Sequence, residues 1–239
     1  MRLCAIDVGT NTVVSVVADV TDGSLDVLAD EERFALLGQG VDASGQLAPE
    51  AMDRVVRHVA AAQGTADRLG AQRIVIGATS ASRDAQNIGD LQDRVRDELG
   101  LDYRVISGVE EAALSFRGAL ALLPGVDAAT VVDVGGGSTE IVTGTRRGGV
   151  AYRTSLDVGS VRLTERHFAE RPPAPPAVRA AQADVAAALE TVALDAVRGR
   201  TVLATGSVAR LLARFAEAEG DPPVVPLDAA EAQRDRLLG

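Results

Sequence analysis

Two stretches of the chain share one pattern of apolar and polar positions. Residues 131–142 contain an apolar run, an aspartate, three glycines, two hydroxyl residues, a glutamate and a second apolar run. Residues 3–14 follow the same order, with Asp-Val-Gly at the end of the first run and a hydroxyl-bearing turn after it. Apolar runs of strand length that flank a glycine turn predict β-hairpins. The repeat predicts a duplicated architecture with one such hairpin in each half.

The remaining apolar positions alternate between helical and strand spacing, with Pro and Gly residues marking the limits of several helices. In the first half we expect three strands within 2–34, a loop at 37–45, helices at 49–69, 88–99 and 109–122, and strands at 73–78 (buried) and 102–106. In the second half we expect a strand at 148–156, a helix at 177–198, a buried strand at 201–204 and a helix from there to about residue 219. This alternation predicts an α/β fold with helices packed on sheets.

The glycine turn of the second hairpin has the composition of an anion-binding element. Only glycine lets successive backbone N–H groups turn toward an anion without a Cβ in the way. Ser138 and Thr139 add hydroxyl donors, and Asp133 and Glu140 flank the turn with carboxylate oxygens suited to a divalent cation. A plain glycine-rich hairpin is the alternative if this turn is considered alone.

A third Asp-Val-Gly occurs at residues 157–159. The residues that follow it, 162–168, have helical spacing. We therefore expect Gly159 and Ser160 to begin a helix, and we do not count this segment as another phosphate loop.

Two further motifs lie between the hairpins, at residues 78–85 (Ala-Thr-Ser-Ala-Ser-Arg-Asp-Ala) and 106–112 (Ile-Ser-Gly-Val-Glu-Glu-Ala). With both hairpins in this order, the sequence resembles the exopolyphosphatase and guanosine pentaphosphate phosphatase (Ppx/GppA) family of the actin and sugar-kinase superfamily, from residue 1 to about residue 215. The resemblance implies two ribonuclease-H-like (actin-like) domains, each a mixed sheet flanked by helices, with a cleft between the two hairpin turns. We place the domains at 1–123 and 124–239, and find no closing C-terminal segment of the kind usual in the family.

The resemblance also implies roles for individual residues. Glu111 matches the family's catalytic glutamate, which orients and deprotonates water, and Glu110 is its neighbour. Arg83 lies in a matching motif and can grip phosphate with two N–H groups. Asp7 is expected to orient water or the hydration shell of the metal. The residues expected to bind substrate are Gly9, Thr10, Asn11, Thr12, Gly135, Gly136, Gly137, Ser138, Thr139, Gly206 and Ser207, and those expected to bind metal are Asp133 and Glu140.

Some of these residues have plainer explanations. Glu110 and Glu111 would favour the positive end of a helix dipole without any catalytic role. Arg83 would pair with Asp84 on the surface. The Gly206-Ser207 turn departs from the longer glycine and threonine element of the family, which leaves this third phosphate contact open.

Charge and composition narrow the function. The 239 residues carry a formal net charge of −10, so a basic nucleic-acid-binding surface is not expected. A polyanionic substrate must then be met by local N–H groups, arginine and a cation, for which we expect Mg2+ or Mn2+. Cys4 is the single cysteine and excludes an intrachain disulfide. We recognise no signal peptide or membrane span, so the cytoplasm is the expected location, and a homodimer is the assembly to be tested.

The expected reaction is hydrolysis of inorganic polyphosphate, guanosine pentaphosphate or both, with release of the terminal phosphate by metal-assisted attack of water. Two alternatives stay open. One is a sugar or acetate kinase of the same superfamily, against which the paired glutamates and the lack of a recognisable sugar-binding segment speak. The other is a non-catalytic sensor of phosphate ligands, for which the altered Gly206-Ser207 turn is a support.

Overall fold

The computed structural model describes all residues except 22–23, 198–200, 221 and 239. Residue contacts divide the chain into two compact units, Met1–Glu111 and Ala112–Gly239. The domain limits expected from the sequence, 1–123 and 124–239, stay a prediction. Within the described ranges, no helix is long and apolar enough to cross a membrane.

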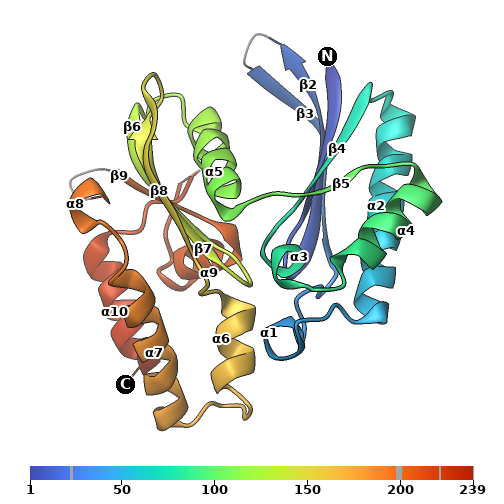
Figure 1. Cartoon of the computed structure of the whole chain (residues 1–239). Helices are drawn as coiled ribbons and strands as arrows, with labels where there is room; N and C mark the ends of the chain where they lie inside the picture. Colours follow the sequence, from blue (N-terminus) through green and yellow to red (C-terminus); the bar gives the residue numbers. More distant parts are fainter. Residues whose placement is uncertain (22–23, 198–200, 221, 239) are drawn as a thin grey trace. The chain divides into compact units, whose positions relative to one another are not determined.

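The first unit is built on a five-stranded mixed sheet with the order β3-β2-β1-β4-β5 (Figure 1). Its strands are β1 (Arg2–Val8), β2 (Thr12–Thr21), β3 (Ser24–Phe34), β4 (Arg73–Ala78) and β5 (Tyr103–Val105), and its helices are α1 (Val41–Ser44), α2 (Pro49–Leu69), α3 (Ser80–Asp84) and α4 (Ile88–Leu99). Strands β1, β2 and β3 pair antiparallel, and β4 and β5 continue the sheet in parallel with β1. The three N-terminal strands and the limits of α2 and α4 are confirmed. The expected turn after β2 falls on residues outside the described part.

One face of this sheet forms the core of the first unit. Cys4, Ile6 and Val8 alternate along β1 and are buried beneath α2, which contributes Val55 and Val59. Alternation of this kind is the period of a strand with one covered face. Strand β4 is not buried along its length as expected, because Val75 points to the other face and is 42% exposed.

The second unit contains a four-stranded sheet with the order β8-β7-β6-β9. Its strands are β6 (Ala128–Val134), β7 (Thr139–Thr145), β8 (Gly149–Leu156) and β9 (Thr201–Thr205), and its helices are α6 (Ser160–His167), α7 (Pro175–Leu189), α8 (Leu194–Val197), α9 (Gly206–Phe215) and α10 (Leu227–Leu238). Helix α5 (Gly108–Leu122) begins at the end of the first unit. From Ala112 onward it packs Phe116 and Leu120 against Val131 and Val142 of the second sheet.

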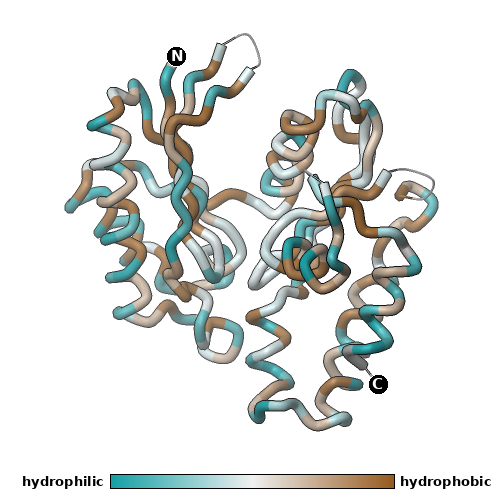
Figure 2. Tube along the Cα trace, turned by 180° about the vertical axis from the view of Figure 1, so that it is seen from behind, coloured by the Kyte–Doolittle hydropathy of each residue, from teal (hydrophilic) through white to brown (hydrophobic). Residues whose placement is uncertain are grey.

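The structure of the second unit differs from the sequence-based predictions in three places. The helix expected at 177–198 ends at Leu189, because Val192 leaves the helical path and packs with Ile141 and Leu156 on the sheet. Strand β9 is not buried, since it lies at the edge of the sheet and Val202 is 62% exposed. The helix after it ends at Phe215 and not near residue 219. Figure 2 shows hydrophobic and hydrophilic positions alternating along the helices, the pattern of one-sided packing.

Candidate functional site

The two hairpin turns share one backbone geometry. The Gly9 N–H donates to the Thr12 carbonyl at 2.9 Å, and the Gly135 N–H donates to the Ser138 carbonyl at 3.0 Å. A Cβ built on either glycine would lie 3.2 Å from that same carbonyl oxygen. Both turns therefore close over a glycine in the same way, and the repeated hairpin expected from the sequence is confirmed.

The carbonyl oxygens of the glycine turn in the second unit point toward the start of α6. The oxygens of Gly135, Gly136 and Gly137 all accept hydrogen bonds from residues 160–162. In a planar trans peptide the N–H points opposite to the C=O. The N–H groups of the same peptides therefore face away from α6, as an anion-binding turn requires.

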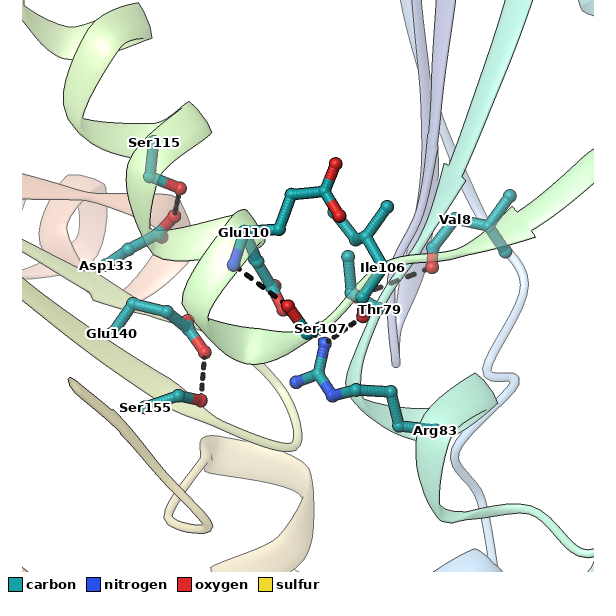
Figure 3. Close-up of polar contacts among 11 residues, drawn as sticks. Val8, Thr79, Arg83, Ile106, Ser107, Glu110, Ser115, Asp133, Glu140 and Ser155 are labelled. Atoms are coloured by element: carbon teal, nitrogen blue, oxygen red, sulfur yellow. Dashed lines mark hydrogen bonds and ion pairs between the residues drawn. The ribbon is translucent and has the colours of Figure 1, made fainter. Parts of the chain in front are cut away.

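Asp133 and Glu140 lie directly opposite each other on β6 and β7. Directly opposed residues of an antiparallel pair point to the same face of the sheet. Each carboxylate accepts one serine hydroxyl: Ser115 Oγ donates to Asp133 at 2.6 Å, and Ser155 Oγ donates to Glu140 at 2.7 Å (Figure 3). Glu140 is only 1% exposed. The serines come from α5 and β8, and neither was predicted from the sequence.

Thr205 lies beside Asp133 in the parallel register of β6 and β9. Its Oγ1 is buried and, among the described residues, makes no hydrogen bond. The next residue, Gly206, has φ +87°, and a Cβ there would lie 2.7 Å from the Val134 carbonyl oxygen and 3.3 Å from Asp133 Oδ1. Only glycine fits this left-handed position at such close approach. Ser207 follows in the first turn of α9 and is exposed.

These oxygens suit a hard divalent cation. Mg2+ binds through one or two protein carboxylates together with waters and substrate phosphates. Asp133, Glu140 and the unsatisfied Thr205 hydroxyl supply such oxygens, so the residues present fit the cation. In the described part of the chain no group of three or more His, Cys, Asp and Glu side chains is placed to hold a metal ion. Substrate oxygens would therefore have to complete the coordination.

The turn of the first unit is held through its backbone. Residues 35–38 donate to it: the N–H groups of Ala35 and Leu36 both bind the Asn11 carbonyl at 2.9 Å, and the Gly38 N–H binds the Thr10 carbonyl at 2.8 Å. Asp7 lies at the carboxyl end of β1 and is exposed. The substrate-binding roles expected for residues 9–12 stay predictions.

Arg83 and Glu111 meet within the first unit. Arg83 Nη1 lies 2.6 Å from Glu111 Oε2 and also donates to the Ile106 carbonyl at 3.1 Å. Both side chains are largely shielded, with exposures of 21% and 16%. The motif around Arg83 forms the short helix α3, which the sequence did not predict. It starts beside β1, since the Thr79 N–H donates to the Val8 carbonyl at 3.1 Å. The Thr79 hydroxyl donates to the same oxygen at 3.4 Å (Figure 3).

Glu110 has a different environment from Glu111. Its carboxylate pairs with Arg104 at 2.6 Å, and its side chain is 36% exposed. Its backbone N–H binds Ser107 Oγ at 3.2 Å, which caps the start of α5 (Figure 3). The two neighbouring glutamates therefore serve different partners, and Glu111 is the more enclosed of the two.

Next to Arg83 in the sequence, Ser82 makes a buried hydrogen bond: its Oγ lies 2.8 Å from the Tyr103 hydroxyl. Burial raises the pKa of Tyr103, so its phenol stays protonated through the physiological range. This pair links α3 to β5 through the residue that precedes Arg83. It was not predicted from the sequence.

Residues 16–234 match the sequence profile of the Ppx/GppA phosphatase family. The chain belongs to this family. Exopolyphosphatase 2 of Mycobacterium tuberculosis is 42% identical over 182 residues, which are 72% of this chain and 56% of that protein. The chain thus spans little more than half the length of this curated relative.

Solved structures of the Ppx/GppA family have the same fold. The PPX-GPPA enzyme of Aquifex aeolicus matches with a TM-score of 0.74 and 29% identity, over 91% of this chain and 71% of that one. An exopolyphosphatase from Cytophaga hutchinsonii matches with a TM-score of 0.81 over all of this chain and 80% of that one, and at 24% identity it supports the fold alone. The α/β fold with two mixed sheets, expected from the sequence, is confirmed.

Proposed function

We propose that this Ppx/GppA family member hydrolyses phosphoanhydride bonds and releases the terminal phosphate of inorganic polyphosphate or guanosine pentaphosphate. The observation that carries the proposal is the glycine turn 135–138, whose carbonyl oxygens are engaged by α6 so that its N–H groups face the opposite side. Fixed N–H groups of this kind neutralise the charge on phosphate oxygens without a basic surface. A basic surface is not expected for a protein with a net charge of −10.

We assign to Glu111 the role of accepting a proton from the attacking water. Hydrolysis of a phosphoanhydride needs little covalent chemistry beyond positioning, charge neutralisation and an acceptor for the proton of water. The Glu111 carboxylate accepts that proton while the water oxygen bonds to the terminal phosphorus and the bridging P–O bond breaks. The shortened phosphate chain leaves with the electron pair of that bond.

Arg83 fixes the orientation of the Glu111 carboxylate. A guanidinium has five N–H donors, so one nitrogen can hold Glu111 and the Ile106 carbonyl while others bind a phosphate oxygen. Asp7 is proposed to orient the same water. Glu110, turned to Arg104, is proposed to have no direct part.

A divalent cation would be held by Asp133 and Glu140, with the Thr205 hydroxyl as a further oxygen. When bound, Mg2+ or Mn2+ neutralises charge on the phosphate oxygens. The hydroxyl donors Ser115 and Ser155 orient the two carboxylates. Gly206 and Ser207 begin α9 beside them, and their N–H groups are proposed to bind another phosphate of the chain.

The test is release of inorganic phosphate from tripolyphosphate, long-chain polyphosphate and guanosine pentaphosphate, measured side by side with Mg2+ and with excess chelator. We expect Mg2+-dependent release from at least one of the three. Binding of these ligands without release would replace the hydrolase with a phosphate-ligand sensor. Transfer of phosphate from ATP to a sugar or acetate would replace it with a kinase.

A further inference from the structure

We propose that residues 158–162, the third Asp-Val-Gly segment, are a positioning element that fixes the glycine turn 135–138. It rests on the proposed function, because phosphate binding by this turn is part of that proposal. The segment has the sequence of a hairpin turn, but Gly159 precedes α6 and the residues after it are helical. The segment therefore does not form a third hairpin turn, and the hairpin repeat does not explain its role.

Every carbonyl of the three glycines is engaged by this segment. The Ser160 N–H donates to Gly135 O at 3.0 Å, and the N–H groups of residues 161 and 162 donate to Gly136 O at 2.8 and 3.1 Å. The Arg162 side chain donates from Nε to Gly137 O at 2.7 Å. The N-terminal N–H groups of a helix have no intrahelical acceptors, and here three of them are bound by the turn.

Gly159 makes this contact possible through its size. A Cβ on Gly159 would lie 2.4 Å from Gly136 O and 2.6 Å from Gly137 N, closer than any real side chain comes. Thr139 Oγ1, at the end of the turn, donates to the Val158 carbonyl at 2.7 Å. The two backbones are thus in direct contact, and neither can move without the other.

The consequence concerns the direction of the turn's donors. Each peptide whose C=O points to α6 has its N–H pointing away, so residues 158–162 determine where the N–H groups of Gly136, Gly137 and Ser138 point. Arg162 acts in this scheme as one N–H donor at Nε. The proposal requires this donor and not the positive charge of the guanidinium. Arg162 is therefore a positioning residue and not a phosphate ligand.

Two neutral substitutions separate these roles. Arg162→Gln keeps a nitrogen donor at the position of Nε, whereas Arg162→Met places a methyl group there, and both remove the charge. We expect kcat/KM for tripolyphosphate to fall about 5-fold or more in Arg162→Met, the factor that one hydrogen bond of typical strength represents, and to stay near wild type in Arg162→Gln. Arg166→Met removes the same charge from the same helix, where Arg166 lies 3.8 Å from Asp184, and is the control.

Hydrogen exchange in the ligand-free protein gives a readout independent of activity. We expect the hydrogen-bonded amides of Gly135 and residues 160–162 to exchange about 5-fold faster in Arg162→Met than in Arg162→Gln or Arg166→Met, because the lost bond loosens the turn. Gly159→Ala should speed the same amides more, since its Cβ would force the two backbones apart. If Gly159→Ala does not fold, the Gln and Met pair still decides.

Equal losses of kcat/KM in Arg162→Gln and Arg162→Met would overturn the proposal, because the donor at Nε would then not be what Arg162 contributes. Unchanged exchange rates at Gly135 and residues 160–162 in all variants would overturn it as well. Failure of the proposed function would look different: the wild type would release no phosphate, while the exchange difference between the two variants remained.

Discussion

Arg83 Nη1 and Glu111 Oε2 lie 2.6 Å apart, joining two segments that are separate in the sequence. The same nitrogen also binds the Ile106 carbonyl, which precedes the glutamate-bearing helix. One guanidinium therefore fixes both the Glu111 side chain and the backbone that leads to it. Of the two adjacent glutamates, Glu111 is the one held by this guanidinium and the more enclosed, whereas Glu110 pairs with Arg104.

We expect Glu111→Gln to lower kcat by about 10²- to 10⁴-fold with little change in KM, as for loss of a general base. The substitution keeps the side-chain shape and an oxygen that Arg83 can bind, and it removes the negative charge and with it the ability to take a proton. Glu110→Gln is the matched control, since that carboxylate pairs with Arg104 and is more exposed. Steady-state phosphate release measures both. A damaging Glu110→Gln beside a mild Glu111→Gln would reverse the two assignments.

Asp133→Ala should weaken metal dependence and turnover together. The substitution removes one of the two opposed carboxylates and leaves the Ser115 hydroxyl without its acceptor. Asp127→Ala, at an exposed position just before the same strand, is the charge-matched control. Titration of activity with Mg2+ measures the effect. A wild-type metal requirement in Asp133→Ala would show that the cation is held elsewhere.

Tyr103→Phe should cost about 1–3 kcal/mol in free energy of unfolding, because it leaves the buried Ser82 hydroxyl without its partner. It should also lower kcat more than it raises KM, since α3 carries Arg83 directly after Ser82. Denaturant melts and steady-state kinetics measure the two effects. Ser82→Ala with Tyr103→Phe closes a double-mutant cycle, and additive losses would mean that the two hydroxyls do not act together.

Cys4 should react with thiol reagents only after unfolding. It is fully buried in the first core, and burial raises the pKa of its thiol. The unfolded chain therefore loses the thiol proton at lower pH than the folded one, so stability falls as pH rises from the unfolded pKa toward the raised folded pKa. Labelling during a guanidinium titration at several pH values checks both points. In Cys4→Ala this part of the pH slope should vanish.

Much of the fold follows from local patterns. The hairpins, α2 and α4 have clear periodicity, and their ends carry Pro49, Gly70 and Gly100. Exposure of Val202 was not predictable, because it depends on which strands lie beside β9. The break after Leu189 was missed because an alanine-rich run is helical by itself, whereas the packing of Val192 on the sheet comes from tertiary structure.

The site was predicted less completely for the same reason. The glycine turns and their flanking carboxylates are contiguous in sequence and could be identified directly. Ser115, Ser155 and Tyr103 take their partners from other elements, and no spacing indicates such pairs. Thr205 comes to lie beside Asp133 only through the pairing of β6 with β9, which the sequence does not show either. The expected roles of Glu111 and Arg83 came from family resemblance, and their contact from the fold.

The backbone contact between Gly159 and Gly136 has an evolutionary consequence. A substitution in either segment must be compatible with the other, so the glycine turn and the start of α6 should be inherited as one unit despite their separation in the chain. Variants that recombine the turn from one family member with the α6 region of another would then lose function more often than variants that exchange both. The motif by which such a site is recognised would accordingly include residues 158–162 as well as the glycine run.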